Sequence, residues 1–432
     1  MSERAPRSKL LKVALCLLLL APGAARAQTP EQPEKPPRLK RDFGSSLERL
    51  RWDADQKLAV EAARASAKQG AGGDEEEEVV RVETSLVVCD VLVLDPRGRA
   101  VSGLGREDFL VTEDGKPQEV GAFALGDSAN VPRSIVLIFD YSGSMRPFIA
   151  NSVLAAKTLV DQLNPRDRMA LVTDDVELLV DFTRDKALLR EKLEELKRRV
   201  TGGENSRGGR YGRSRQYSAL MATLRELFDE EDTRPIVIFQ TDGDELAALH
   251  DSPLHGFAPP GVSPEAFKAA RAATQRVFSI ADVFREAERS RVTVYTVIPG
   301  VRLIGLKPGE ENKKAEALRR ELEKDSAPGF PYVPARERWL QDTIRRTPPQ
   351  QLALYGLSKL TGGWTNFLEE PAQAAGIYAD IFSDIGRRYV VGFYPTSKGR
   401  DGKRRRVQIE VRGHPEYTVW GRKSYYAPGP DE

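Results

Sequence analysis

From residue 133 onward, apolar strand patterns alternate with amphipathic helix patterns, and this alternation constrains the fold more than any other feature. Residues 134–139 and 235–240 are near-continuous apolar runs, which is typical of strands buried on both faces of a sheet. We therefore predict an α/β fold with a doubly wound, mostly parallel sheet covered by helices. The other elements predicted here are strands at 169–172, 176–182, 292–298 and 364–367 and helices at 147–163, 186–200, 217–228, 281–289, 352–360 and 371–385.

Residues 300–348 interrupt this alternation with a charged helix pattern at 311–324 between proline-rich flanks. The stretch is too long for an ordinary connection between a strand and a helix. We therefore predict a domain over residues 133–387 that carries an insertion at 300–348.

Strand patterns flank this domain on both sides. Residues 79–128 alternate apolar and polar residues and contain Asp114-Gly115, a hairpin-turn sequence, so they predict a small β module with strands at 79–94, 103–109, 109–113 and 120–125. Residues 388–428 predict a C-terminal β extension, with strands at 389–394, 405–411 and 417–420, that pairs with the first module. Cys89 is expected to be a buried packing residue, and the basic run 403–406 to keep a terminal hairpin soluble.

The first 27 residues have the pattern of a bacterial signal peptide. A basic start precedes the apolar stretch 13–20, and Ala25-Arg26-Ala27 offers a cleavage site. The apolar stretch is shorter than the roughly 20 residues that span a bilayer. Cys16 would suit a lipoprotein signal, but Leu15 stands where that signal needs a small residue. We expect an exported protein that is periplasmic or extracellular, either secreted or held at the cell surface.

Residues 28–78 are expected to be a partly disordered linker. The stretch 28–45 is rich in Pro, Gln and charge, residues 46–68 have loosely helical spacing, and four consecutive glutamates end the segment at residue 78. The predicted signal carries five basic residues and one acidic residue, so the formal charge of +2 becomes −2 after its removal. This balance does not favour a nucleic-acid partner. Only Cys89 remains after cleavage, which excludes an internal disulfide, and no later segment is long enough for stable membrane insertion.

The sharpest local signal is Asp140-Tyr141-Ser142-Gly143-Ser144, directly after the first buried strand. Asp242 follows the strand predicted at 235–240. With a strand order of 3-2-1-4-5-6, the two strands would be neighbours at the point where the order reverses, and ligands bind at such points. Carboxylate and hydroxyl oxygens suit Mg²⁺ or Mn²⁺ better than zinc.

Simpler interpretations of these residues stay open. Ser142 or Ser144 could cap the helix expected from about residue 147, since serine favours this position. Asp244 is expected to be a loop or helix-start residue. The arrangement after two apolar strands nevertheless favours a metal site.

The Asp140–Ser144 loop, with Asp242 after a later strand, resembles the metal-ion-dependent adhesion site of von Willebrand factor type A domains. The resemblance implies that Ser142 and Ser144 bind the metal directly and that Asp140 and Asp242 complete the shell. It also implies a hydroxyl ligand from an intervening loop, for which Ser218 is the first candidate and Thr201 the rival. The whole chain resembles the acidobacterial type of A-domain protein through the 86–116 pattern and a terminal Tyr-Tyr-Ala-Pro at 425–428.

The resemblance implies a binding module whose metal captures an Asp or Glu of a partner protein. Four arginines in a Gly-rich loop could attract that partner: Arg207, Arg210, Arg213 and Arg215. Two rival functions remain, a structural scaffold with a degenerate metal site and a metal-assisted hydrolase. The second is weakened because the chain has only three histidines and no nucleophile elbow, paired-histidine zinc motif or phosphate loop. We expect a binding protein and no enzyme.

Overall fold

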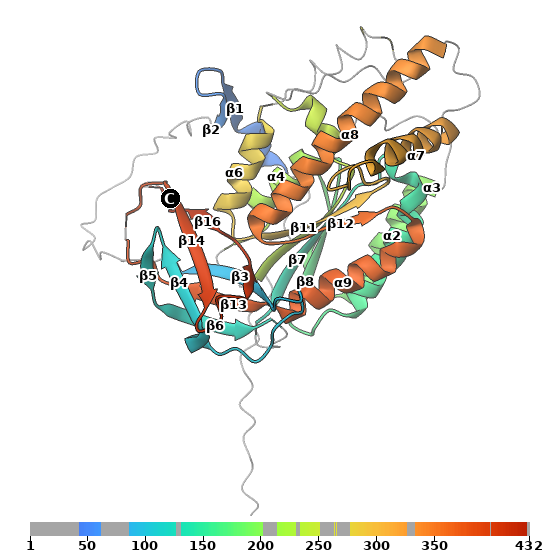
Figure 1. Ribbon diagram of the computed structural model, residues 1–432. Coiled ribbons are helices and arrows are strands. Elements are labelled where there is room, and N and C mark those ends of the chain that lie inside the picture. The colour runs from blue at the N-terminus through green and yellow to red at the C-terminus, as the bar shows by residue number, and fades with distance from the viewer. Residues whose placement is uncertain are drawn as a thin grey trace, which may run out of the picture. The chain divides into compact units, whose positions relative to one another are not determined.

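The computed structural model describes residues 43–61, 86–126, 131–201, 214–229, 234–250, 263, 265, 277–325, 333–397 and 399–429. Its centre is a six-stranded sheet in the order β12-β11-β10-β7-β8-β9 (Figure 1). The strands are β7 (Arg133–Phe139), β8 (Arg168–Thr173), β9 (Glu177–Thr183), β10 (Arg234–Gln240), β11 (Thr293–Pro299) and β12 (Thr365–Leu368). Counted along the chain, this is the 3-2-1-4-5-6 order, the condition under which β7 and β10 are neighbours. All neighbours are parallel except β9, which runs antiparallel to β8.

Helices cover both faces of this sheet, as the doubly wound prediction requires (Figure 1). Alternate residues of β7 point to opposite faces because side chains alternate along a strand. Ile135 and Leu137 pack with α2 (Arg146–Asp161), α3 (Lys186–Thr201) and α9 (Ala374–Arg387). Val136 and Ile138 pack with α4 (Gln216–Glu226), α6 (Ile280–Arg289) and α8 (Val333–Thr361). Every residue of β7, β10 and β11 is buried, which accounts for their continuous apolar runs.

The two flanking β segments form a pair of four-stranded sheets. One sheet has the order β15-β3-β13-β6 and the other β16-β14-β4-β5. The strands are β3 (Val87–Leu94), β4 (Phe109–Glu113), β5 (Lys116–Gln118), β6 (Val120–Leu125), β13 (Tyr389–Phe393), β14 (Arg404–Val411), β15 (Thr418–Trp420) and β16 (Ser424–Tyr426). Strand β13 lies between β3 and β6, and β14 pairs with β4, so each sheet combines both ends of the described chain. Cys89 is buried in the shared apolar core.

In the N-terminal β module, one predicted strand is absent and the predicted hairpin turn is present. The strand expected at 103–109 is wrong, because an irregular stretch and the 3₁₀ turn η1 (Arg106–Asp108) precede β4. Asp108 accepts a hydrogen bond from the backbone N–H of Gly105 and so holds this turn. The β4–β5 hairpin does turn at Asp114-Gly115, where both residues have positive φ, the conformation of a type I′ turn.

The N-terminal part of the described chain corrects the linker prediction. Residues 43–61, whose spacing from residue 46 onward is loosely helical, form the short helix α1 (Ser45–Glu48) and a hairpin of β1 (Leu50–Asp53) and β2 (Leu58–Glu61). Residues 62–68 lie outside the described residues. Leu47 and Leu50 are buried in the core beside α4. Glu226 at the end of α4 accepts hydrogen bonds from the backbone N–H groups of Gly44 and Ser46. Contacts with α4 therefore stabilise this segment, and the spacing of apolar residues along the sequence does not predict such contacts.

The insertion also differs from its predicted boundary. The charged helix is present as α7 (Glu310–Asp325). The helix predicted at 352–360 is wrong in its start, because α8 begins at Val333 and continues through Pro348 and Pro349. Contacts just after the prolines hold the helix in place. Gln351 donates to the carbonyl of Val301 at 2.8 Å, and its Oε1 accepts from the N–H of Leu303 at 2.8 Å. No helix in the described residues is long and apolar enough to cross a membrane.

Candidate functional site

The loop after β7 holds three of the predicted site residues. The Asp140 carboxylate is fully buried and accepts a 2.9 Å hydrogen bond from the backbone N–H of Ser142. The 3₁₀ turn η2 (Gly143–Met145) then leads into α2. The cap position of α2 is Met145, and no side chain caps the helix there. Ser142 and Ser144 are therefore not the capping residues of this helix, and the simpler interpretation of the motif is wrong.

Asp242 lies opposite this loop, because β7 and β10 are neighbours in the sheet. The backbone N–H of Asp140 donates to the carbonyl of Gln240, the last residue of β10. Ser144 Oγ donates to Asp242 Oδ2 at 2.5 Å, and the hydroxyls of Ser142 and Ser144 are 3.2 Å apart. Gly243 turns the chain with a φ of +79°, where glycine is favoured. The structure thus brings together four of the five predicted ligands.

Ser218, the fifth predicted ligand, is not part of this cluster. It lies in the first turn of α4 and is buried. Its hydroxyl donates to Glu245 Oε1 at 2.7 Å, and its backbone N–H donates to Glu245 Oε2 at 3.0 Å. The helix start therefore directs Ser218 to η4 (Asp244–Ala248) and not to the aspartates. The rival Thr201 is the last residue of α3.

Gln216, which the sequence did not single out, occupies the space between the two aspartates. Its Nε2 donates to Asp140 Oδ2 at 3.0 Å and reaches Asp242 Oδ1 at 3.4 Å. Its Oε1 accepts from the backbone N–H of Glu245 at 3.0 Å. A backbone N–H can only donate, so this bond fixes the amide with its NH₂ group toward the carboxylates. The only available signal was its position two residues before Ser218.

The two carboxylates are held in an environment that disfavours their charges. Burial raises the pKa of Asp140, against hydrogen bonds from Ser142, Gln216 and Thr241 that lower it. Burial and then the negative charge of Asp140 raise the pKa of Asp242. Thr241 Oγ1 donates to Asp140 Oδ2 at 2.9 Å, so several neutral donors partly compensate these groups. A cation would stabilise both ionised forms.

The loop after β8 is hydrogen-bonded both to the Asp140 loop and to the start of α4. Asp174 Oδ1 accepts from the backbone N–H of Tyr141 at 3.2 Å, and its Oδ2 accepts from Ser214 Oγ at 2.7 Å. The backbone N–H of Arg215 donates to the carbonyl of Asp174 at 2.8 Å. These bonds tie the start of α4 to the Asp140 loop and hold both in one arrangement.

The predicted partner-attracting arginines are only partly described. Arg207, Arg210 and Arg213 lie outside the described residues, and Arg215 immediately precedes α4.

The insertion contributes a basic residue that was not predicted from the sequence. Arg346 of α8 lies 3.5 Å from Asp244 Oδ1 and pairs with Asp342 at 3.0 Å. Asp244, predicted as a loop residue, begins η4 and is about half exposed, with a side-chain relative exposure of 47%.

The donor set fits a hard divalent cation in its chemistry. Two carboxylates and two hydroxyls converge from Asp140, Asp242, Ser142 and Ser144, and oxygen donors of this kind suit Mg²⁺ or Mn²⁺. No group of three or more His, Cys, Asp or Glu in the described chain could hold a metal. A site for such an ion here therefore depends on the serine hydroxyls as well as on the aspartates.

Histidines do not join the cluster in the part of the chain that the structure describes. The His250 ring stacks on Trp52 with centroids 4.3 Å apart, and the His414 ring stacks on Tyr417 at 4.4 Å. His255 lies outside the described residues. The two described rings therefore have packing contacts of their own, and neither is hydrogen-bonded to a site residue.

Fold and site together define an α/β domain with an oxygen-lined site where the strand order of its parallel sheet reverses. The family description "von Willebrand factor type A domain" matches residues 135–245, from the first buried strand through the Asp242 loop. These residues of the chain therefore carry a von Willebrand factor type A domain match. A comparison with curated proteins finds no match.

Several solved structures are similar to the chain at low identity. An aerotolerance-related membrane protein from Bacteroides fragilis is 11% identical, with a TM-score of 0.32, and the match covers 59% of this chain and 99% of that one. The conserved hypothetical protein BatB from Bacteroides thetaiotaomicron is 12% identical, with a TM-score of 0.33 and coverages of 58% and 98%. A manganese-loaded TRAP protein from Plasmodium vivax is 12% identical, with a TM-score of 0.27 and coverages of 73% and 98%.

Proposed function

We propose that this protein is an exported binding module that captures an Asp or Glu side chain of a partner protein through a bound Mg²⁺ or Mn²⁺ ion. The observation that carries the proposal is the convergence of Asp140, Ser142, Ser144 and Asp242 at the reversal of the strand order. Export is proposed from the signal-peptide pattern of residues 1–27, with the periplasm, the cell surface or the medium as destination.

The chemistry of the donors supports binding in preference to catalysis. Ser142 and Ser144 are neutral, so an ion held by them and by one or two carboxylates keeps positive character. Such an ion would supply the charge that attracts a partner's carboxylate. Asp140 and Asp242 would hold the ion, while Gln216 and Thr241 orient the Asp140 carboxylate through hydrogen bonds.

Selectivity for the partner is proposed to come from the surroundings of the ion. Arg207, Arg210, Arg213 and Arg215 precede α4, and Arg346 of the insertion reaches the exposed Asp244 beside Asp242. Positive charge near the site would raise the rate at which an acidic partner arrives. Nucleic acid is not the proposed partner.

The decisive experiment is calorimetric titration of residues 28–432 with Mg²⁺ and Mn²⁺. We expect saturable binding by the wild type and its loss in Asp140→Ala. Asp380→Ala is the matched control, because Asp380 is exposed on α9 and has no role in the site. Partner capture from a secreted or surface fraction should then require the metal. If Asp140→Ala with Mg²⁺, or the wild type in EDTA, captured the partner as well as the wild type does with Mg²⁺, the proposed mechanism would be ruled out.

A second candidate is a structural scaffold with a degenerate metal site, and Gln216 is the observation that favours it. The Gln216 amide already donates to both aspartates, and Ser218 is engaged with Glu245. Under this alternative, neither Mg²⁺ nor Mn²⁺ binds, and the melting temperature of the protein is the same in Mg²⁺ and in EDTA. Binding by the wild type that is lost in Asp140→Ala would eliminate the scaffold.

A further inference from the structure

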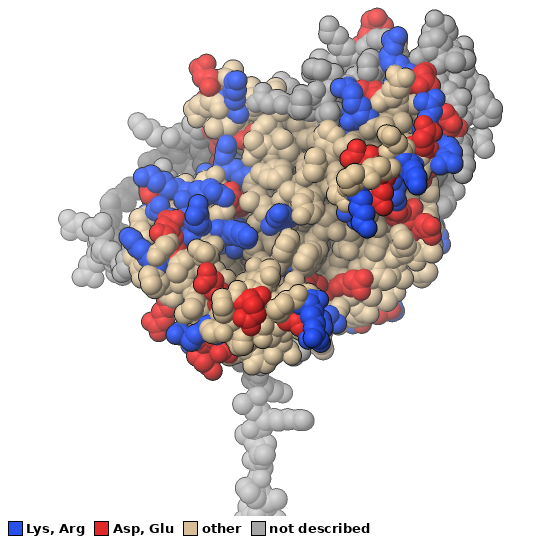
Figure 2. Space-filling model, in the orientation of Figure 1, with Lys and Arg blue, Asp and Glu red and all other residues tan. Residues whose placement is uncertain are grey.

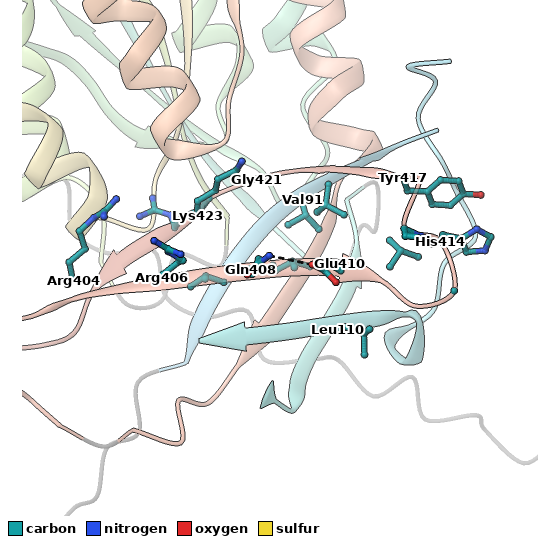
Figure 3. A pocket seen from close by; sticks show the side chains of 17 residues that line it. Val91, Leu110, Arg404, Arg406, Gln408, Glu410, His414, Tyr417, Gly421 and Lys423 are labelled. Carbon is teal, nitrogen blue, oxygen red and sulfur yellow. Dashed lines mark hydrogen bonds between the residues drawn. The ribbon is translucent and has the colours of Figure 1, made fainter. Parts of the chain in front are cut away.

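A groove of about 760 Å³ lies between the two sheets of the β region, far along the chain from the metal-site motif. Its walls come from β14 on one side and from β15 and β3 on the other (Figure 3). Val91, Val419 and Tyr417 supply apolar surface. Arg404, Arg406 and Lys423 lie at one end of the groove, and His414 and Tyr417 lie at the other.

One wall of this groove is an open strand edge. Along β14, β16 pairs only with residues Arg404–Arg406, whereas β4 pairs with Val407–Val411. No described strand pairs with the other side of β14 over Val407–Val411. An edge of this kind can accept another extended chain.

The register shows which backbone groups face the groove. Arg406 O accepts from Asp114 N, and Arg412 N donates to Asp108 O, so the even-numbered residues of β14 direct their hydrogen bonds to β4. Val407 N donates to Lys423 O, on the opposite side. The N–H and C=O of Ile409 and the N–H of Val411 therefore point into the groove.

The charge at the groove's end selects the kind of chain that fits. Figure 2 shows Lys and Arg side chains gathered over β14 and β16. Arg406 and Lys423 are exposed, and neither has a side-chain partner among the described residues. Arg404 pairs with Glu288 at 2.6 Å but keeps 55% of its side chain exposed. Arg404, Arg406 and, farther along, Glu410 point outward from β14, while Val407 and Val411 are buried, so the positive charge is confined to the β16 end of the groove.

We propose that this groove binds an extended acidic segment of a partner protein, which adds as a strand to the β14 edge. Main-chain hydrogen bonds to Ile409 and Val411 would hold the segment. Because side chains alternate along a strand, its inward residues would be apolar. Its outward residues would be acidic at the end nearest β16, where Arg406 and Lys423 lie diagonally within reach, while Glu410 lies on the same outward face farther along the edge. The proposal is independent of the metal site.

Fluorescence anisotropy with a labelled Glu-Val-Glu-Val-Glu-Val-Glu peptide tests the proposal on residues 28–432. We expect saturable binding that EDTA and Asp140→Ala leave unchanged. Two control peptides separate the contributions. Gln-Val-Gln-Val-Gln-Val-Gln removes the charges, and an acidic peptide methylated on alternate backbone nitrogens removes main-chain donors. Each should bind at least about tenfold more weakly, a difference of about 1.4 kcal/mol.

Variants of the groove provide the matched test. Ile409→Pro removes an N–H that faces the groove and leaves the bonds to β4 intact, as proline permits on an edge. The double variant Arg406→Glu/Lys423→Glu reverses the charge without changing the backbone. Each should weaken peptide binding by about tenfold or more. Arg97→Glu, an exposed change at the turn after β3, should have no effect.

Several results would overturn the proposal. Absence of peptide binding would do so, as would equal binding of the backbone-methylated peptide, since the groove would then attract any polyanion. Heparin that binds as tightly as the acidic peptide would point to a polysaccharide. Binding seen only after Glu75, Glu76, Glu77 and Glu78 are changed to Gln would identify the chain's own acidic run as the occupant. Dimers of the wild type that Ile409→Pro dissociates would identify a second copy.

Discussion

The buried carboxylate of Asp140 and the partly buried carboxylate of Asp242 share a single amide donor from Gln216. The arrangement follows from parallel strands that end side by side and place the residues after them at one edge of the sheet. Burial and mutual repulsion make the charged forms costly, and neutral donors recover part of that cost. The charge state of the pair therefore depends on the pH, and a cation bound there would offset the cost of the two charges.

The contribution of Asp242 to the stability of the metal-free protein should fall as the pH rises above about 4, the ordinary carboxyl range. The folded-state pKa of Asp242 is raised, so between the two pKa values the folded protein keeps a proton that the unfolded chain has released. The contribution of Asp242 to the free energy of unfolding is thus present at low pH and is lost as the pH rises toward its folded-state pKa. Urea unfolding in EDTA should show a gap between wild type and Asp242→Asn that grows by up to about 1.4 kcal/mol per pH unit. Parallel curves for the two proteins would contradict this.

At the scale of elements, one buried arginine joins the parallel sheet to the β region. Arg234, the first residue of β10, pairs with Asp90 of β3 at 3.0 Å. It also donates to the carbonyls of Gly126 at 2.7 Å and Ile385 at 3.0 Å. Its side chain is fully buried, so its charge depends on these partners.

Replacing Arg234 with Leu should cost about 3–5 kcal/mol of unfolding free energy, because Asp90 is left buried without its partner. The double variant Arg234→Leu/Asp90→Leu should lose less than the sum of the two single variants. Urea denaturation of the three variants measures the coupling. Arg99→Leu, which breaks the exposed pair with Asp95, is the control and should change little. Additive single losses would show that the pair is not a unit.

At the scale of the whole described chain, the β region depends on strands that are distant in sequence. Strand β13 follows α9 directly and fills the space between β3 and β6. Arg422 donates to the carbonyls of Glu288 and Val292 around the end of α6, at 2.7 and 3.0 Å. The C-terminal segment therefore contributes two strands to each sheet and also holds the end of α6 in place.

Removal of residues 388–432 should prevent the β region from folding. The truncated chain would expose the apolar core around Val91 and Phe109, which β13 and β14 cover. We expect aggregation in size-exclusion chromatography and a loss of β signal in circular dichroism. Removal of residues 430–432 alone is the control. A monomeric truncated protein with an unchanged β signal would contradict the expected dependence.

The sequence by itself determined the α/β class and, on the condition of a 3-2-1-4-5-6 strand order, the meeting of Asp140 with Asp242. These features follow from local patterns, because buried strands are continuously apolar and the loops after neighbouring parallel strands share one edge. Only the tertiary structure decided that Gln216 and not Ser218 faces the aspartates, that α8 continues through Pro348, and that Leu47 and Leu50 are buried. Each of these outcomes depends on which face of an element meets a distant neighbour, and sequence spacing does not report that contact.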